Sequence, residues 1–217
     1  MKIGTDGVLL GAWVSIEATD SVLDIGTGTG LIALMIAQRT NGQCKIDAVE
    51  IDDNACQDAD ENFRQSPWPN SLHLNKGRIQ DFGAELKYKL ITANPPYFNN
   101  SLQSPDVNRA AARHTESLKF EELVASVNRL MHPDGRFGVI LPPTEAKLLE
   151  QMMNETGLHT IRSWSFKSRK EKPVERRLME FSRMSGKHET GEIILYDDQN
   201  SWSESYLKLT QDFYLRR

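Results

Sequence analysis

Short apolar runs alternate with segments of helical spacing along the first two thirds of the chain. Five runs rich in Val, Ile and Leu are bounded mostly by Gly, Pro, Asn or Asp, a pattern typical of buried strands. They cover residues 21–25, 45–51, 71–74, 89–93 and 136–141. Apolar residues recur at helical spacing in residues 31–39, 52–65, 120–131 and 144–156. This β–α alternation predicts an α/β fold with a mostly parallel sheet and helices on both faces.

The last third of the chain breaks this alternation. Residues 159–166 and 176–183 are strand-like runs with no helix between them, which favours an antiparallel hairpin at the edge of the sheet. Residues 201–214 are expected to form a C-terminal helix. One side of that helix carries Tyr206, Leu209, Phe213 and Tyr214. We therefore expect a single domain over residues 1–217, with a seven-stranded sheet and one antiparallel edge strand.

Three glycines, Gly26, Gly28 and Gly30, stand where the first predicted strand turns into a helix, in the run DIGTGTG. Glycines there allow tight turns and let a ligand approach the main chain. Glu50 ends the next strand, where an acid can accept both hydroxyl groups of a ribose. Asp24 precedes the glycines and would repel a phosphate but attract an ammonium group. Because the loop also reads GxGxG rather than GxGxxG, these residues favour S-adenosylmethionine over a dinucleotide.

Asp81 follows the third predicted strand, in the sequence QDF. A carboxylate at this position can accept a hydrogen bond from the adenine amino group of the cofactor. An equally good interpretation is a helix N-cap on a surface loop. The sequence leaves both open.

A second motif, Asn94, Pro95, Pro96 and Tyr97, directly follows the fourth predicted strand. Consecutive prolines make a stiff, extended corner and donate no N–H, so nothing competes for its carbonyl groups. The amino nitrogen of adenine is a poor nucleophile because its lone pair is delocalised into the ring. The Asn94 side-chain oxygen and the Pro95 carbonyl can accept its two N–H groups and localise that lone pair, while Tyr97 stacks on the base. The motif therefore predicts a site that orients and activates a flat aromatic amine.

Together these motifs resemble the class I, Rossmann-like S-adenosylmethionine-dependent methyltransferases that act on planar nitrogen. The opening MKIGTDGVLLGAW, the runs DIGTGTGLIALMIAQR, IDAVEID, QSPW and NPPYF, and the closing LTQDFYL are similar to the bacterial tRNA1(Val) adenine N6-methyltransferases. The likeness runs from the first residue to the last. Family members usually carry a few dozen residues before the opening motif. We therefore expect a short N-terminal segment to be missing, with consequences for cofactor closure and RNA grip.

The resemblance implies S-adenosylmethionine as cofactor and, as substrate, the tRNA adenine just 3′ of the anticodon. It also implies that Thr5 and Asp6 lie near the methionine end of the cofactor, although the pair can equally cap a helix. The expected catalytic residues are Asn94, Pro95, Pro96 and Tyr97. The expected cofactor-binding residues are Thr5, Asp6, Asp24, Gly26, Thr27, Gly28, Gly30, Glu50, Ile51, Asp81 and Asn94.

Charge is distributed unevenly along the chain. The net charge is -4, which argues mildly against a nucleic-acid partner, and residues 45–62 hold seven acids against one base. Residues 162–187, by contrast, hold nine bases against three acids, so an acidic half and a basic hairpin region can coexist in one RNA enzyme.

Two groups of basic residues are candidates for holding RNA. Arg109, Arg113 and His114 lie in a long polar loop after the NPPY motif, and a loop of this length is usually functional or disordered. The second group follows the first strand of the hairpin and would make binding salt-sensitive: Lys167, Arg169, Lys170, Lys172, Arg176 and Arg177. The alternative is a hairpin loop that is merely solvated.

Composition narrows the class of protein further. Cys44 and Cys56 form no CxxC pair and suggest reduced thiols in a cytoplasmic protein. No apolar run is long enough for a membrane span, the N-terminus does not resemble a signal peptide, and the scattered histidines suggest no metal site.

Two other functions are compatible with the motifs. A protein methyltransferase acting on a glutamine amide also uses NPPY, because an amide nitrogen has the same delocalised lone pair, but such enzymes normally carry an N-terminal helical domain. A non-catalytic nucleotide-binding module could keep the fold, although the intact Asp24, Glu50, Asn94 and Tyr97 argue against decay of the site.

Overall fold

The computed structural model of this protein describes residues 4–83, 86–96, 118–184, 186 and 188–214. Its strands are β1 (Ser21–Ile25), β2 (Lys45–Glu50), β3 (Leu72–Lys76), β4 (Tyr88–Ala93), β5 (Met131–Leu141), β6 (His159–Lys167), β7 (Arg176–Ser182) and β8 (Glu189–Ile194). Its helices are α1 (Thr5–Trp13), α2 (Leu31–Arg39), α3 (Asp53–Gln65), α5 (Phe120–Leu130), α6 (Pro143–Glu155), α7 (Glu204–Thr210) and the short 3-10 helix η1 (Gln211–Phe213).

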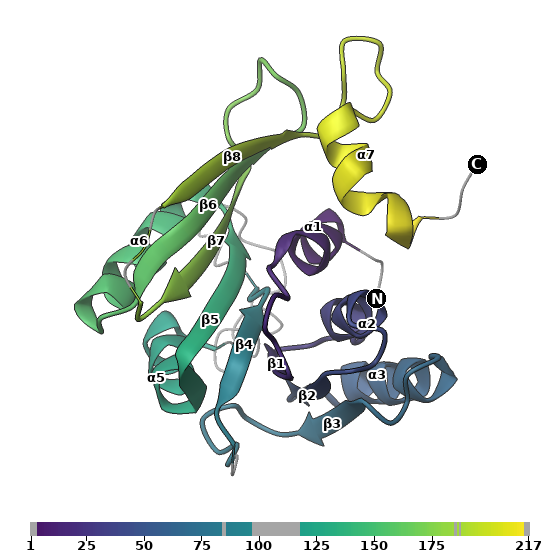
Figure 1. The fold of residues 1–217 in the computed structure, drawn as a ribbon, viewed down its shortest axis with the longest axis vertical. Helices are drawn as coiled ribbons and strands as arrows, with labels where there is room; N and C mark the ends of the chain where they lie inside the picture. Colours follow the sequence, from purple (N-terminus) through teal and green to yellow (C-terminus); the bar gives the residue numbers. More distant parts are fainter. Residues whose placement is uncertain (1–3, 84–85, 97–117, 185, 187, 215–217) are drawn as a thin grey trace, which may run out of the picture.

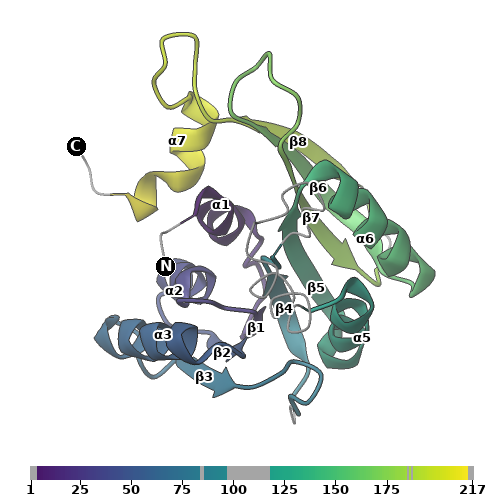
Figure 2. The ribbon, with the colours of Figure 1, turned by 180° about the vertical axis from the view of Figure 1, so that it is seen from behind.

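The strands form one twisted sheet between two layers of helices (Figure 1). Helices α1, α2, α3 and α7 lie on one face, and α5 and α6 lie on the other, as the reverse view in Figure 2 also shows. The strand order is β3-β2-β1-β4-β5-β7-β6-β8. The predicted α/β fold, with a mostly parallel sheet and helices on both faces, is confirmed.

The parallel part of the sheet, β1 to β5, positions the candidate site. Strands β1 and β4 pair in parallel at its centre, and Val22, Leu23, Leu90 and Ile91 are fully buried because helices cover both faces. Strand β2 pairs with β1 and leads into α3, whose N-cap Asp52 accepts the Ala55 N–H at 2.8 Å. The carboxyl ends of β1, β2 and β4 therefore meet at one edge of the sheet, where ligands of open α/β folds bind.

The hairpin at the other side of the sheet is larger than the sequence predicted. Strand β7 is antiparallel to both β5 and β6, which confirms the antiparallel hairpin. Strand β8 was missed; it pairs in parallel with β6 and forms the edge, so the sheet has eight strands and β7 lies inside it. The pattern concealed β8 because only Ile193 in its sequence ETGEII is buried.

Two local features depart from a simple sequence interpretation. The segment HPDG is a bulge within β5: Tyr88 of β4 pairs with Met131, whereas Leu90 pairs with Arg136. The interpretation of Thr5–Asp6 as a helix cap is wrong, because both residues lie in the first turn of α1 and Gly4 is its N-cap.

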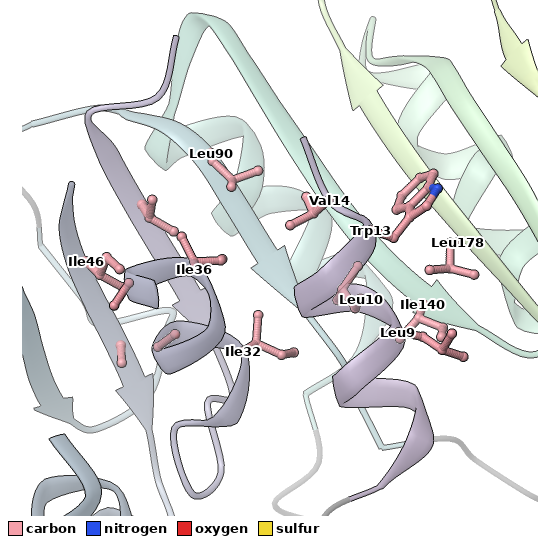
Figure 3. Close-up of a cluster of buried hydrophobic side chains, with 14 of the residues drawn as sticks. Leu9, Leu10, Trp13, Val14, Ile32, Ile36, Ile46, Leu90, Ile140 and Leu178 are labelled. Carbon is pink, nitrogen blue, oxygen red and sulfur yellow. The ribbon is translucent and has the colours of Figure 1, made fainter. Parts of the chain in front are cut away.

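Helix α1 packs against both the parallel part of the sheet and the antiparallel hairpin. Its side chains Leu9, Leu10 and Trp13 are buried among residues of α2, β5 and β7 (Figure 3). Figure 3 shows Ile32 of α2 on one side of this helix and Leu178 of β7 on the other. This packing fixes the N-terminal end of α1 above the edge of the sheet that carries the candidate site.

Candidate active site

The glycine loop lies where the carboxyl ends of β1 and β2 meet. The N–H groups of Gly26 and Thr27 both donate to the Val49 carbonyl, at 2.9 and 3.1 Å. Gly26 has a φ of +66°, and a Cβ added there would meet no atom within 4 Å, so its open side faces space that a ligand can occupy. The loop therefore forms a cradle of main-chain atoms at the edge of the sheet.

Gly30 serves a different purpose from Gly26. It is the N-cap of α2 with a φ of +84°, and a Cβ there would lie 2.3 Å from the buried Phe63 ring of α3. Gly30 is absent from the walls of the cavities at this edge of the sheet. Its role is to let α2 and α3 approach each other closely.

Asp24 is fully buried beneath the glycine loop. Its two carboxylate oxygens accept hydrogen bonds from the Thr27 hydroxyl at 2.6 Å and the Thr92 hydroxyl at 2.8 Å. Burial raises the pKa of Asp24 to about 6, and the two hydroxyl bonds partly oppose that rise. Asp24 thus ties the loop to β1 and β4 and is absent from the cavity wall, so its predicted contact with an ammonium group stays a prediction.

Glu50 is held at the end of β2 by the main chain. Its Oε2 accepts the Gly28 N–H at 2.8 Å, and its Oε1 accepts the N–H groups of Ile51 at 2.8 Å and Asp52 at 2.9 Å. These three bonds fix the orientation of the carboxylate. A carboxylate held in this orientation can accept hydrogen bonds from the hydroxyl groups of a ligand on its open side.

Two adjoining cavities open around Glu50. The inner cavity lies over β2 and β3 and is lined mainly by Val49, Gly77, Ile79, Gln80 and Glu122. The central cavity extends from the glycine loop to α1 and the carboxyl end of β4. Both share the following lining residues: Ile25, Gly26, Glu50, Ile51 and Leu118. Together they make one elongated cleft, whose inner end has the apolar side chains Val49 and Ile79 and the polar side chains Arg78, Gln80 and Glu122 in its wall.

Asp81 lies next to the inner cavity but not in its wall. Its side chain is exposed, and its N–H donates to the Arg78 carbonyl at 3.1 Å within a turn, so the alternative interpretation as a helix N-cap is wrong. The neighbouring Ile79 and Gln80 line the cavity instead. The sequence pattern predicted that the segment around Asp81 lies at the ligand site, and this segment borders the cavity. The pattern did not show which of its side chains face the cavity, because the turn conformation decides that.

The proline corner forms the opposite wall of the central cavity. Asn94, Pro95 and Pro96 all line it, together with Thr27 and Gly28 of the glycine loop. Asn94 is half-buried and Pro95 is buried, so the corner is held firmly at the end of β4. The motif and the glycine loop, 64 residues apart between Gly30 and Asn94, thus share one cavity. Tyr97, Arg109, Arg113 and His114 lie outside the described residues.

The N-terminal end of α1 completes the central cavity. Thr5, Asp6 and Gly7 line it, as does Arg176 at the start of β7. The Arg176 Nε donates to Asp6 Oδ2 at 2.8 Å, which joins α1 to the hairpin across the cavity wall. Sequence analysis grouped Arg176 with the basic residues of the hairpin, since no local motif marks it as part of this wall.

Most of the basic residues in region 162–187 are engaged within the protein. Arg162 lies over the Trp13 ring at 4.3 Å and pairs with Glu189 at 3.1 Å, and Lys167 pairs with Glu192 at 2.5 Å. Arg169 lies 5.6 Å over the Tyr196 ring and donates to Asn200. Lys170 and Lys172 are exposed, and neither forms an ion pair with another described residue. Of the bases predicted here to hold RNA, Lys167 is therefore neutralised by an acid, and the RNA contact of the others stays a prediction.

Comparison with known families defines the class of protein. Residues 16–196 match a family model described as a methyltransferase domain. Solved structures share the fold: a predicted O-methyltransferase from Agrobacterium tumefaciens is 13% identical, with a TM-score of 0.75 over 98% of this chain and 100% of that chain. A glycopeptide N-methyltransferase in complex with S-adenosylmethionine is 12% identical, with a TM-score of 0.62 over 84% of this chain and 100% of that one. The fold and the match together define a methyltransferase.

Curated relatives narrow this class to one family. A tRNA1(Val) (adenine(37)-N6)-methyltransferase from Pseudoalteromonas translucida is 41% identical over 100% of this chain and 92% of its own length. Proteins of the same name from Aeromonas salmonicida and Bacteroides fragilis are 42% and 39% identical, over 100% of this chain and 91% and 92% of their lengths. The chain belongs to the tRNA1(Val) (adenine(37)-N6)-methyltransferase family.

No helix in the described part of the chain is both long and apolar enough to cross a membrane. No group of three or more His, Cys, Asp or Glu side chains in the same residues is arranged to hold a metal ion.

Proposed function

We propose that this protein transfers a methyl group from S-adenosylmethionine to the N6 amino group of adenine in the anticodon loop of tRNA1(Val). One observation carries the proposal: the glycine loop, with Glu50 beside it, and the proline corner line a single cavity. The names of the relatives supply the substrate. The free, buried thiols of Cys44 and Cys56 support a cytoplasmic location, which is part of the proposal.

The residues of the cleft fit the proposed cofactor. In the inner cavity, the apolar side chains Val49 and Ile79 suit the faces of an adenine ring. Glu50 stands at the junction of the two cavities, where a ribose would lie. The open side of Gly26 leaves room for a ligand against the main chain. When bound, S-adenosylmethionine supplies an electrophilic methyl group on its sulfonium.

The proline corner orients the acceptor amine in this proposal. The side-chain oxygen of Asn94 and the carbonyl of Pro95 accept the two N–H groups of adenine and localise the nitrogen lone pair. Tyr97, whose ring we expect to stack on the base, holds the nitrogen in line with the methyl group. The catalysis is then mainly orientation and electrostatic positioning, because the methylated amine loses its proton readily to water.

The loop between β6 and β7 supplies the proposed contact with RNA phosphates. Strand β6 runs parallel to β5, both being antiparallel to β7, so this loop emerges at the same edge of the sheet as the proline corner. Its exposed bases are Lys170 and Lys172, and Arg169 stands beside them over Tyr196. Lys167 is a weaker candidate because Glu192 neutralises it. An unpaired anticodon-loop adenine is less costly to bring into the site than a base in a duplex.

Labelled methyl transfer tests the function directly. Purified protein with labelled S-adenosylmethionine is expected to methylate unmodified tRNA1(Val), and digestion to nucleosides followed by mass analysis is expected to yield N6-methyladenosine. Label on a release-factor protein but not on RNA would favour the glutamine methyltransferase. Binding of the cofactor without transfer to either substrate would favour a non-catalytic module.

A further inference from the structure

One cation stands among the described residues that line the central cavity. It is Arg176, the first residue of β7, which is 146 residues beyond Gly30 at the end of the glycine loop. The cavity wall around it contains glycines, threonines, apolar residues, the proline corner and the two acids Asp6 and Glu50. An anionic group of a ligand in this cavity therefore has one oppositely charged side chain within the described wall.

Arg176 is held in place from two directions. Its Nε donates to Asp6 Oδ2 at 2.8 Å, and its Nη1 donates to the Glu175 carbonyl at 2.7 Å. Asp6 is itself fixed because α1 is anchored in the core by Leu9 and Trp13, both almost fully buried. The Arg176 side chain is about 29% exposed and lines the central cavity, so its guanidinium is positioned in advance beside a ligand there.

The chemistry of the proposed cofactor supplies an anion for this position. Its methionine end carries an α-carboxylate and an α-ammonium group, whereas its adenosine end is neutral. A planar guanidinium has several N–H groups and binds carboxylates with two parallel hydrogen bonds, so it can retain Asp6 while it receives a second carboxylate. Asp6, on the same wall, offers a negative charge to the ammonium group. The ion pair thus matches both charges of an amino acid.

We propose that Arg176 binds the α-carboxylate of S-adenosylmethionine, with Asp6 as the residue that positions its guanidinium. The inference rests on the proposed function only in requiring this cofactor. It makes β7, a strand of the antiparallel hairpin, part of the cofactor site. The cofactor site is then completed by a contact between α1 and β7, two distant parts of the chain.

Ligands that differ by the carboxylate test this role without RNA. Calorimetry would compare S-adenosylhomocysteine with its decarboxylated analogue, S-adenosyl-3-thiopropylamine, on the wild-type protein and on Arg176→Gln. A lost charge-assisted pair corresponds to roughly 10- to 100-fold weaker binding, expected here for S-adenosylhomocysteine alone. Affinity for the decarboxylated ligand is expected to stay within about twofold of the wild type, since that ligand has no group for Arg176 to hold.

Two other results would overturn the proposal. Equal weakening of both ligands would mean that Arg176 only supports the wall. Unchanged affinity for both, with a raised KM for tRNA, would mean that Arg176 contacts an RNA phosphate instead. If the carboxylate-dependent loss is seen but wild-type protein methylates no RNA, the proposed function fails while the role of Arg176 stands.

Two further variants control the interpretation. Asp6→Ala is expected to weaken both ligands, because both keep the ammonium group that Asp6 faces, and to weaken S-adenosylhomocysteine further, because the guanidinium is no longer held at Nε. Arg183→Gln makes the same change of charge just beyond the other end of β7, where Arg183 donates to Asn128 Oδ1 at 2.8 Å, and is expected to bind both ligands normally. A loss in Arg183→Gln as large as that in Arg176→Gln would show that net charge, not position, matters.

Discussion

The two sides of the candidate site hold their charges by different means. On the β1–β2 side, the Glu50 carboxylate is fixed by three main-chain N–H groups, all within 22 residues of it in the sequence. On the hairpin side, charged side chains from distant parts of the chain hold one another, as Arg176 of β7 holds Asp6 of α1. The first arrangement depends on local backbone conformation, and the second depends on the assembled fold.

This difference predicts where function and stability are sensitive. Changes on the glycine-loop side should lower kcat, where they remove a positioned group, or the free energy of unfolding, where they strain the backbone. Changes on the hairpin side should act through affinity, because exposed and half-buried ion pairs contribute little to stability. The predictions below test this division.

The largest effect is expected at the proline corner. Asn94→Ala removes one of the two acceptors proposed for the adenine amine, and loss of a positioned hydrogen-bonding group of this kind typically lowers kcat by about 100- to 1000-fold. Cofactor affinity is expected to remain close to that of the wild type. Single-turnover kinetics and calorimetry with S-adenosylhomocysteine would measure the two quantities. An equal loss in both would assign Asn94 to cofactor binding or to structure.

The site residues that sequence analysis found share one property: their neighbours in sequence determine their place. The glycine loop, Glu50 and the proline corner each follow a strand whose carboxyl end must lie at one edge of a parallel sheet. Arg176 and the pairing of Lys167 with Glu192 depend on the hairpin register and on β8, which the pattern did not reveal. A run of like charges in sequence therefore overstates the basic surface, because acids from other segments pair with Arg162, Lys167 and Arg176.

Gly30 provides the second test, on the stability of the glycine-loop side. Gly30→Ala places a Cβ 2.3 Å from the Phe63 ring at a φ of +84°, so backbone strain and overpacking add to a loss of about 2–5 kcal/mol. Gly157→Ala is the matched control: its φ is +77°, but nothing lies within 4 Å of the added Cβ, so about 1–2 kcal/mol is expected. Urea unfolding would measure both, and equal losses would contradict the packing role of Gly30.

Asp24 links stability to pH on the same side. Its pKa is raised from 3.8 to about 6 in the folded protein, so between these values the folded state binds more protons than the unfolded state. The contribution of Asp24 to the free energy of unfolding is therefore expected to fall as pH rises from about 4 to 6, by on the order of 2–3 kcal/mol. Asp24→Asn cannot titrate. The difference in urea-unfolding free energy between variant and wild type should shift over this range, and a constant difference would contradict the raised pKa.

The smallest effect is expected on the hairpin side, at the loop between β6 and β7. Lys170→Gln with Lys172→Gln removes two exposed charges, so the KM for tRNA should rise a few-fold and the slope of log affinity against log salt should fall by about 1–2. Lys45→Gln is the matched control, because Lys45 begins β2 at the opposite edge of the sheet. Salt titrations of tRNA binding would separate the variants. Identical slopes in all three proteins would mean that RNA does not contact this loop, and the hairpin would then serve the site through Arg176 alone.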